Sequence, residues 1–425
     1  MKFKIVLQRP RGMNDLLFEE SDFFLNLKNE VIKHSQLYSF NYIQTPALED
    51  EKVFTSSLGD SSDVVEKEMF YIKEKDGGSK YVLKPEGTAS IMRAYLQNGM
   101  HSLPQPVKLF YFDRMYRREK PQLGRFREHT QWGLEIIGSS DPIYDAQIIQ
   151  VFDRFFKKTF KLKDYIFKIN SLGCKKDRKS YIKDLKNYYR KNLKNICKDC
   201  QNRYKKNPLR LLDCKNENDQ IYKKNAPNLI NYLCKECENH ISKVLEYLDI
   251  LEIKYEIDHL LVRGFDYYTK TVFEIFFIES NKAIGGGGRY DDLAQYLGSK
   301  NIPAVGGAIG IERLTEILKI HNVNLRKNKK PEVFIAQTTD KTKEYALKIY
   351  DELIRNNIIV AENFGKGNLS SQLELANKLG IKYFLIVGHQ EIGNKTIILK
   401  DMIKRSQDII PVNNIVSEIK KRLKL

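Results

Sequence analysis

The sequence predicts an α+β protein with a large N-terminal domain that contains antiparallel strands and a smaller α/β domain at the C-terminal end. Three observations predict it. An amphipathic helical pattern and a short strand begin the chain, a long strand–loop–strand segment covers residues 108–137, and strands alternate with helices beyond residue 331. At 425 residues and 42% hydrophobic, the chain can bury a large core and divide into domains.

The first predicted element is a helix within residues 16–38. Its apolar positions recur on one helical face, at Phe23, Phe24, Leu27, Val31 and Ile32. A strand is expected at residues 42–46. Pro46 indicates the end of that strand or a sheet edge, because proline cannot donate a hydrogen bond within a central ladder.

The second predicted element is a β-hairpin with strands at residues 109–119 and 129–137. Residues 120–127 between them are basic and contain the proline and glycine of a chain reversal. Because side chains alternate along a strand, we expect Arg117 and Glu119 to share one face of the first strand.

On the second strand of the hairpin, Gln131, Gly133 and Glu135 are expected to share one face. A protein rarely buries such polar groups without a ligand, because each unpaired buried charge costs several kcal/mol. A surface hairpin whose charges meet water is the alternative.

Two glycine-rich segments follow. Residues 305–314, Val-Gly-Gly-Ala-Ile-Gly-Ile-Glu-Arg-Leu, join a glycine-rich entry to a helix, which allows a nucleotide to approach the backbone closely. Residues 286–288 are three consecutive glycines before Arg289 and Tyr290. A pocket wall and a plain tight turn explain these three glycines equally well.

The charge of the chain favours a polyanionic partner. Lysine and arginine number 72 against 54 acidic residues, so the formal charge is +18. The excess is concentrated between residues 175 and 240, which makes this segment a candidate phosphate-contacting face. A lysine-rich, solvated surface is the alternative.

Five of the six cysteines, Cys197, Cys200, Cys214, Cys234 and Cys237, fall within 41 residues. Two Cys-x-x-Cys pairs could hold one tetrahedral zinc ion through Cys197, Cys200, Cys234 and Cys237, with Cys214 left over. We favour the alternative, reduced cysteines packed as small hydrophobes in a helical insert.

No stretch approaches the roughly 18 consecutive apolar residues that span a bilayer, and the first ten residues are too short for a signal sequence. We therefore expect a cytoplasmic protein that has no membrane partner.

A charged linker at residues 322–331 marks a domain boundary, so we expect domains at residues 1–325 and 331–425. Beyond the linker, strands are expected at residues 333–336, 358–361, 383–387 and 396–400, and helices near residues 343–356 and 370–379. This alternation predicts a small domain with a largely parallel sheet.

These segments together resemble the class II aminoacyl-tRNA synthetases. The first helix and strand are similar to motif 1, the hairpin at Arg117 and Glu119 to motif 2, and the helix that carries Arg313 to motif 3. Residues 261–274, Leu-Val-Arg-Gly-Phe-Asp-Tyr-Tyr-Thr-Lys-Thr-Val-Phe-Glu, closely resemble a signature of the histidyl-tRNA synthetase family.

Three further segments agree with this family. They are residues 286–293, Gly-Gly-Gly-Arg-Tyr-Asp-Asp-Leu, residues 11–15, Arg-Gly-Met-Asn-Asp, and residues 83–88, Leu-Lys-Pro-Glu-Gly-Thr. One departure is Asp292, where the family usually has glycine, and it bears on the local turn geometry.

The resemblance implies a homodimeric histidine–tRNA ligase that activates L-histidine with ATP and Mg²⁺ and then charges tRNA(His). It also implies an antiparallel catalytic sheet flanked by helices, a basic insert at about residues 172–250 against the tRNA acceptor arm, and an anticodon-binding domain at residues 331–425.

The resemblance also assigns the residues of the first reaction step. Arg117 would bind the α-phosphate of ATP, Arg313 the γ-phosphate, and Arg263 the reacting carboxylate and α-phosphate, with Glu119 also in the ATP site. Arginine suits these positions because it is permanently charged and can bind an anion through two N–H groups.

The histidine site follows in the same way. Glu135 and Tyr268 would bind the imidazole, and Glu86, Thr88 and Gln131 the α-amino group. The lining would be completed by Gly87, Arg263, Tyr267 and Tyr290, although Tyr267 could instead be a core aromatic. Arg125 and Arg127 in the basic loop would face the acceptor end of tRNA, or simply meet water.

Two rival functions stay open. One is the synthetase paralogue that regulates ATP phosphoribosyltransferase, which lacks the C-terminal anticodon domain; residues 331–425 argue against it. The other is an RNA-binding or tRNA-sensing module with a decayed active site. The presence of Arg117, Arg263, Arg313, Glu86 and Glu135 argues against decay.

Overall fold

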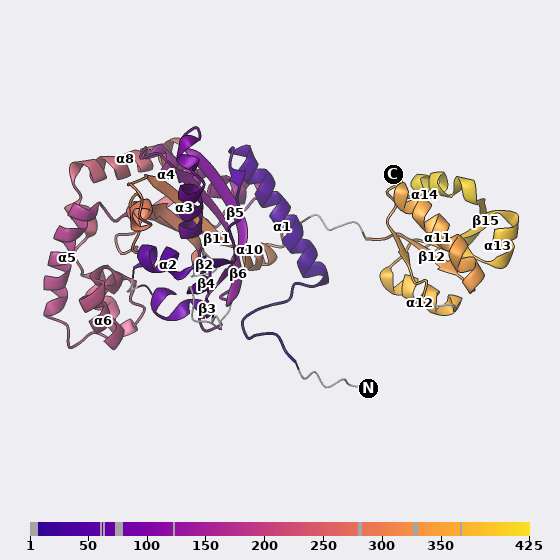
Figure 1. The fold of residues 1–425 in the computed structure, drawn as a ribbon, viewed down its shortest axis with the longest axis horizontal. Helices are drawn as coiled ribbons and strands as arrows, with labels where there is room; N and C mark the ends of the chain where they lie inside the picture. Colours follow the sequence, from indigo (N-terminus) through magenta and orange to yellow (C-terminus); the bar gives the residue numbers. More distant parts are fainter. Residues whose placement is uncertain are drawn as a thin grey trace. The chain divides into compact units, whose positions relative to one another are not determined.

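A mostly antiparallel sheet of eight strands forms the centre of residues 1–326 in the computed structural model of the protein (Figure 1). The outermost strand at each edge of the sheet runs parallel to its neighbour, and the other five pairings are antiparallel. The strands lie in the order β1 (Asn41–Tyr42), β5 (Val107–Tyr116), β6 (Glu128–Ile137), β11 (Ala304–Gly310), β10 (Ala283–Arg289), β9 (Thr269–Phe277), β7 (Tyr165–Ser171) and β8 (Tyr255–Ile257). The fold class is the α+β class that the sequence predicts.

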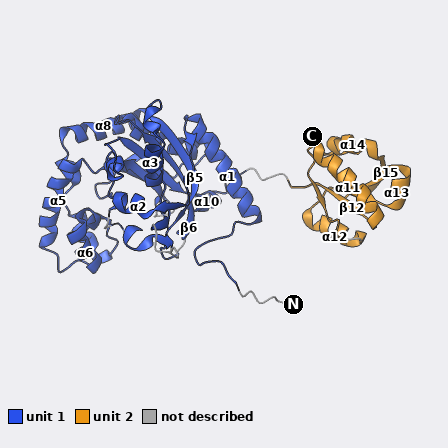
Figure 2. Cartoon of the chain, in the orientation of Figure 1, with its two compact units in different colours: residues 1–326 blue, residues 327–425 orange. Residues whose placement is uncertain are grey.

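The structure describes residues 7–59, 62, 64–72, 80–121, 124–278, 283–325, 330–365 and 368–425. The chain divides into two units, residues 1–326 and 327–425 (Figure 2). Residues 326–329 of the predicted linker and residues 122–123 of the predicted basic loop lie outside the described part. Among the helices that the structure describes, none is long and apolar enough to cross a membrane.

The predicted hairpin is present as β5 and β6, and Asp113 of β5 lies opposite Gln131 of β6. The first strand is shorter than predicted: it ends at Tyr116, so Arg117 and Glu119 lie in the connecting segment rather than on a strand face. The strand predicted at residues 42–46 is also shorter, because the backbone oxygen of Thr45 accepts a hydrogen bond from Lys84 Nζ at 2.8 Å instead of joining the ladder.

Helices cover the two faces of the sheet differently. One face packs on α1 (Phe18–Leu37), α4 (Ile143–Arg154), α8 (Lys235–Ile250) and α10 (Ile311–Ile320), in a core that includes Trp132, Leu134 and Ile136 of β6. The alternate residues of β6, beginning with Gln131, therefore face the opposite side, as the period of two predicts.

That opposite side is only partly covered. Its core includes residues of α2 (Glu51–Leu58), α3 (Thr88–Gln97) and α9 (Leu293–Tyr296). A small sheet of β2 (Leu48–Asp50), β4 (Tyr81–Leu83) and β3 (Phe70–Ile72) lies next to α2 in sequence.

The glycines at residues 286–288 lie within β10, between β9 and β11, so the tight-turn interpretation is wrong. Glycine is needed in this strand because its neighbours are close: a Cβ at Gly286 would stand 2.7 Å from an Arg263 Nη atom and 2.5 Å from the backbone oxygen of Phe273. Asp292 causes no strain, because it caps α9 at φ −90° and does not need the positive φ of glycine.

The insert between β7 and β8 is helical, as predicted (Figure 1). It contains α5 (Lys175–Arg190), α6 (Lys198–Lys206), α7 (Gln220–Lys224) and α8, with 3₁₀ turns at Pro208–Asp213, Glu217–Asp219 and Leu229–Tyr232. Tyr181 and Leu185 of α5 pack with Leu211 and Leu212, which ties the insert to the core on the partly covered side of the sheet.

The second unit contains a five-stranded sheet in the order β13 (Val360–Glu362), β12 (Val333–Gln337), β14 (Tyr383–Val387), β15 (Thr396–Asp401) and β16 (Ser406–Pro411). The first three strands are parallel, but β15 and β16 are antiparallel, so the prediction of a largely parallel sheet holds for only half of the pairings. Its helices are α11 (Asp340–Arg355), α12 (Leu369–Leu379), α13 (His389–Asn394) and α14 (Ile415–Leu423).

Candidate active site

A cavity of about 360 Å³ opens on the partly covered side of the sheet, in the N-terminal unit. Its wall combines the end of the β5–β6 hairpin, the start of α3, residues 262–268, the glycines of β10 and β11, and the start of α10. Ten residues that the sequence selects as candidates line it: Glu86, Thr88, Arg117, Glu119, Arg125, Gln131, Arg263, Tyr267, Tyr268 and Arg313.

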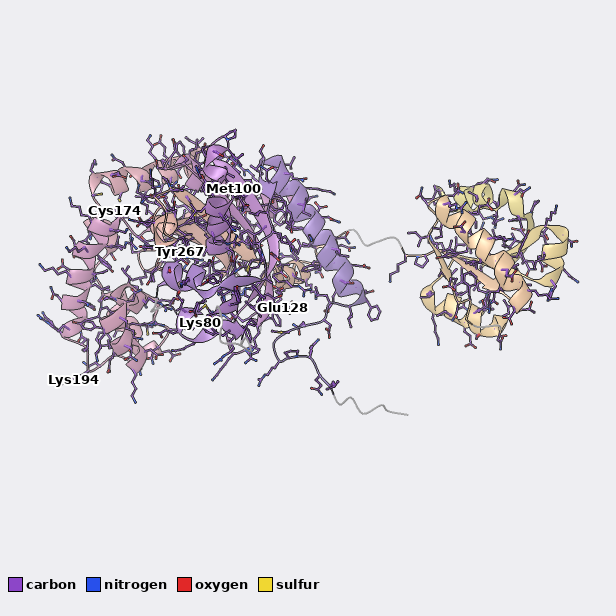
Figure 3. The ribbon with its side chains drawn as sticks, in the orientation of Figure 1. Lys80, Met100, Glu128, Cys174, Lys194 and Tyr267 are labelled. Carbon is purple, nitrogen blue, oxygen red and sulfur yellow. The ribbon has the colours of Figure 1, made fainter. Side chains whose placement is uncertain are left out.

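Four selected residues do not line the cavity directly. Glu135 and Tyr290 lie just behind Thr88, and Gly87 connects Glu86 to Thr88 at the start of α3. Arg127 lies farther along the loop, where its Nε donates to the backbone oxygen of Glu119 at 3.3 Å. Tyr267, which does line the cavity, is otherwise enclosed by the unit and is 1% exposed (Figure 3).

One end of the cavity is acidic and buried. Both carboxylate oxygens of Glu86 accept hydrogen bonds from the first turn of α3, from the N–H groups of Thr88 and Ala89, each at 2.8 Å. Burial raises the pKa of Glu86, and these two hydrogen bonds and Arg117 oppose the rise. The carboxylate keeps further lone pairs with which it can accept from a ligand.

Behind this end lies Glu135, which is fully buried. The Thr88 hydroxyl donates to one of its oxygens at 2.7 Å, and the Tyr290 hydroxyl donates to the other. Burial raises the pKa of Glu135 to about 8, and the two hydroxyl donors only partly offset this. Among the described residues, the recorded hydrogen-bond donors to this carboxyl are the Thr88 and Tyr290 hydroxyls, and neither is a cation.

Other lining residues are cationic. Arg313 Nε donates to the Gly124 oxygen at 2.9 Å, and Arg117 Nε donates to the Pro85 oxygen at 2.9 Å, so both guanidinium groups are held in place. Burial, with the charges of Arg125 and Arg117, lowers the pKa of Arg313. Burial and the charges of Arg117 and Arg313 lower the pKa of His129 to about 3, so this histidine is neutral. Such crowding of cations favours an anion with several charges.

Arg263 also lines the cavity. Its Nη1 donates to Glu274 at 2.6 Å, and its guanidinium lies 5.5 Å from the centre of the Tyr268 ring. Its Nε is buried and has no hydrogen-bond partner among the described residues. A buried guanidinium with an unsatisfied donor indicates a position for an acceptor that a ligand supplies.

Several cavity residues were not selected from the sequence. Arg210, Asp213 and Lys215 reach the cavity from the insert, although more than 40 residues separate them from the nearest signature. Arg210 and Asp213 belong to the stretch at residues 207–214, Asn-Pro-Leu-Arg-Leu-Leu-Asp-Cys, which resembles the insert of the family and was the signal that could have identified them; Lys215 follows it directly. Glu274 ends the signature run at residues 261–274, and its pairing with Arg263 needed the fold.

The cysteines do not form the single four-cysteine site considered from the sequence. Cys197 and Cys200 lie with Cys214, and Cys234 and Cys237 lie with Cys174, in two separate groups that each include an aspartate. The physical reason is that the two Cys-x-x-Cys pairs begin different helices, α6 and α8, and each pair meets another segment of the insert.

Comparisons with known proteins agree on one family. The family model described as histidyl-tRNA synthetase matches residues 12–314, and the model of an anticodon binding domain matches residues 332–422. The chain is 41% identical to the histidine–tRNA ligase of Thermosipho melanesiensis over 93% of this chain and 94% of that protein. It is 40% identical to that of Halothermothrix orenii over 98% and 99%.

A solved structure agrees as well. The apo histidyl-tRNA synthetase of S. aureus is 30% identical, with a TM-score of 0.80 over 98% of this chain and 100% of that one. The mostly antiparallel sheet and the helices that pack on it are those of a class II aminoacyl-tRNA synthetase. Within that class, the chain belongs to the histidyl-tRNA synthetase family.

Proposed function

We propose that this chain is a histidine–tRNA ligase. It activates L-histidine with ATP, which yields histidyl-adenylate and pyrophosphate, and it then transfers histidine to the 3′ end of tRNA(His). The observation that carries the proposal is one cavity lined both by the guanidinium groups of Arg117, Arg263 and Arg313 and by the buried carboxylate of Glu86, with Glu135 behind Thr88.

In the first step an oxygen of the histidine carboxylate forms a bond to the α-phosphorus of ATP, and the bond from that phosphorus to the bridging oxygen breaks. Negative charge grows on the phosphoryl oxygens, so fixed cations stabilise the transition state. We assign Arg117 to the α-phosphate, with Glu119 beside it, and Arg313 to the γ-phosphate. Arg263 lines the same cavity and would bridge the carboxylate and the α-phosphate.

Histidine would occupy the acidic end. Glu86, Thr88 and Gln131 would accept hydrogen bonds from the α-ammonium group, and Gly87 keeps the backbone close to it. Glu135 and Tyr268 would bind the imidazole nitrogens. Tyr267 and Tyr290 would complete the wall, with Tyr290 also holding Glu135 in place.

Magnesium would accompany ATP. The cavity offers carboxylates singly, and two of them, Glu119 and Glu274, are already paired with Arg125 and Arg263. A magnesium ion here would therefore be held chiefly by the phosphates of the nucleotide, as the ion prefers few protein ligands. When bound, it neutralises phosphate charge.

For the second step we assign residues 1–325 as the catalytic domain and residues 331–425 as the anticodon-binding domain. Arg125 and Arg127 would face the tRNA acceptor end, and the basic insert at residues 172–250 would lie against the acceptor arm. The formal charge of +18 supports a polyanionic substrate. This reaction belongs in the cytoplasm, where uncharged tRNA is available.

We also propose a homodimer, in which the α1–β1–β2 region is the interface. Leu37, Tyr42 and Leu48 of this region are exposed large apolar side chains. A partner subunit that covered them would remove apolar surface from water. Sedimentation at micromolar concentration tests this, and a monomeric mass would contradict it.

The function is tested by amino-acid-dependent exchange of labelled pyrophosphate into ATP, run with each of the twenty amino acids. We expect exchange with histidine alone, followed by histidine transfer to tRNA(His). A folded chain that binds histidine but supports no exchange would contradict the proposal and favour a regulatory or sensing role.

Replacing Arg313 by alanine is expected to raise the KM for ATP by about tenfold to a hundredfold, because a charge-assisted contact to phosphate contributes about 1.5–3 kcal/mol. The KM for histidine should change little, since Arg313 donates to the backbone oxygens of Gly124 and Ala283 and not to a residue assigned to histidine. Steady-state exchange kinetics with each substrate varied in turn checks this. An equal rise in both KM values would contradict the assignment of Arg313 to ATP.

A further inference from the structure

All six cysteines of the chain gather in two clusters within the insert, outside the cavity described above; Cys200, Cys214 and Cys237 are buried and the other three cysteines are half-buried. The α6 cluster contains Cys197, Cys200, Cys214 and Asp219. The α5–α8 cluster contains Cys174, Asp177, Cys234 and Cys237. In each cluster, one sulfur or oxygen atom from every member lies within 4.8 Å of all the others. Cys174 stands directly before α5 (Figure 3).

We propose that each cluster is a structural zinc site with three thiolates and one carboxylate, so that the chain binds two zinc ions. The proposal stands on the geometry of the insert and does not depend on the reaction. Zinc fits because it takes four ligands in a closed tetrahedron and favours sulfur, with some oxygen.

The distances in the α6 cluster match a tetrahedron around one ion. With zinc–sulfur bonds of about 2.3 Å and zinc–oxygen bonds of about 2.0 Å, tetrahedral angles place two sulfurs about 3.8 Å apart and a sulfur and an oxygen about 3.5 Å apart. Cys197 Sγ and Cys214 Sγ are 4.0 Å apart, and Cys214 Sγ is 3.3 Å from Asp219 Oδ2. An iron–sulfur cluster would hold its protein ligands farther apart, because several atoms stand between them.

Hydrogen bonds already orient the ligand atoms of the α6 cluster. The Cys200 N–H donates to Cys197 Sγ and the Asn216 N–H donates to Cys214 Sγ, each at 3.4 Å. The Cys197 N–H donates to both oxygens of Asp219 at 3.1 Å. Backbone donors of this kind fix metal ligands and stabilise their negative charge.

The α5–α8 cluster has a similar arrangement. Asp177 accepts from the Cys174 N–H at 3.1 Å and from the Cys234 N–H at 3.0 Å. Both aspartates are nearly fully buried, at 3% exposure for Asp177 and 2% for Asp219. Five of the six cysteines, all except Cys214, also lie at or near the N-terminal ends of α5, α6 and α8, where the helix dipole favours negative charge. Cys214 follows the 3₁₀ turn at Pro208–Asp213.

Two alternatives explain less. Cysteines packed as small hydrophobes would not place a buried carboxylate among three sulfurs, since that burial is costly. Disulfides would leave one cysteine over in each cluster, and the Cys197–Cys214 separation of 4.0 Å is about twice a sulfur–sulfur bond.

The test begins with the full-length chain, made in zinc-supplemented cells, purified in reductant and analysed by mass spectrometry for metals. We expect two zinc ions per chain, in keeping with the two clusters. Metal-free chain titrated with Zn²⁺ alone should recover the same stoichiometry. Zinc no higher than in the buffer blank, together with no uptake on titration, would overturn the proposal without any variant being needed.

Variants separate the two sites. Cys214→Ala and Cys237→Ala should each retain one ion, and the double variant none; loss of both ions from either single variant, or of neither, contradicts two independent sites.

Asp219→Cys is the sharper variant, because a fourth thiolate completes the site. With Co²⁺ alone, it should keep a tetrahedral visible spectrum and gain intensity in the thiolate charge-transfer band. A weak octahedral spectrum from the unaltered chain would also overturn the proposal.

Discussion

Replacing Arg263 by alanine is expected to lower histidine-dependent pyrophosphate exchange by about a thousandfold, the loss typical of a pre-organised donor to transition-state charge. The Arg263 Nε is buried and has no hydrogen-bond partner in the described part of the chain, and its Nη1 is held by Glu274, so the guanidinium is already positioned for an anion. Stopped-time exchange assays at saturating ATP and histidine measure the loss in kcat.

The controls separate charge from shape and from folding. Arg263→Lys keeps the charge but not the planar pair of donors, and we expect it to recover only a small part of the activity. Arg190→Ala removes an exposed arginine at the end of α5 and should leave exchange unchanged. Activity of Arg263→Ala within tenfold of the unaltered chain would contradict the proposed role.

Replacing Glu135 by glutamine is expected to lower kcat/KM for histidine by about a hundredfold or more, because an amide, unlike a carboxyl, cannot ionise to give the ring N–H of the substrate a charged acceptor in a buried site. Thr88 and Tyr290 can both still bond to the amide, so the pocket wall should survive. Exchange kinetics with histidine varied measures this effect.

Glu49→Gln is the matched control, since Glu49 is also buried but lies outside the cavity in an ion pair with Arg93. It should lower stability and leave the KM for histidine unaltered. A histidine KM in Glu135→Gln equal to that of the unaltered chain would refute the assignment of Glu135 to the imidazole.

The same carboxyl predicts a pH effect on the unliganded chain. Burial raises the pKa of Glu135 from 4.5 to about 8, so between these pH values the folded chain keeps a proton that the unfolded chain loses. The contribution of Glu135 to the free energy of unfolding therefore falls as pH rises through this window. We expect Glu135→Gln to melt at a higher temperature than the unaltered chain near pH 8, with a smaller difference near pH 5. Calorimetry without substrates checks this, and a difference independent of pH would contradict it.

Much of the fold follows from local patterns. The hairpin and α1 were predictable because apolar residues recur with the period of a strand or a helix, and Trp132, Leu134 and Ile136 do occupy the core face of β6. The candidate residues came mainly from family resemblance. Their meeting at one cavity needed the antiparallel pairing of β6 with β11, which places Glu135 opposite Gly306.

The remainder depends on contacts that local patterns do not encode. The role of glycines 286–288 depends on which strands flank them, and the sequence of one strand does not determine which strands pair with it. The cysteines show the same limit: the spacing of two pairs suggested one shared site, but Cys174 and Cys214 join from distant turns. Arg210, Asp213 and Lys215 reach the cavity only because the insert folds back over it.

The glycines of β10 and β11 form a cavity floor made of backbone. A Cβ at Gly306 would overlap the Glu135 carboxylate, and one at Gly286 would displace Arg263. A floor without side chains has no rotamers, so it cannot adapt its shape to a different substrate or to a substitution elsewhere. Efforts to redesign this pocket for another amino acid must therefore act on the walls, at positions such as Tyr268 and Gln131, and leave the floor as it is.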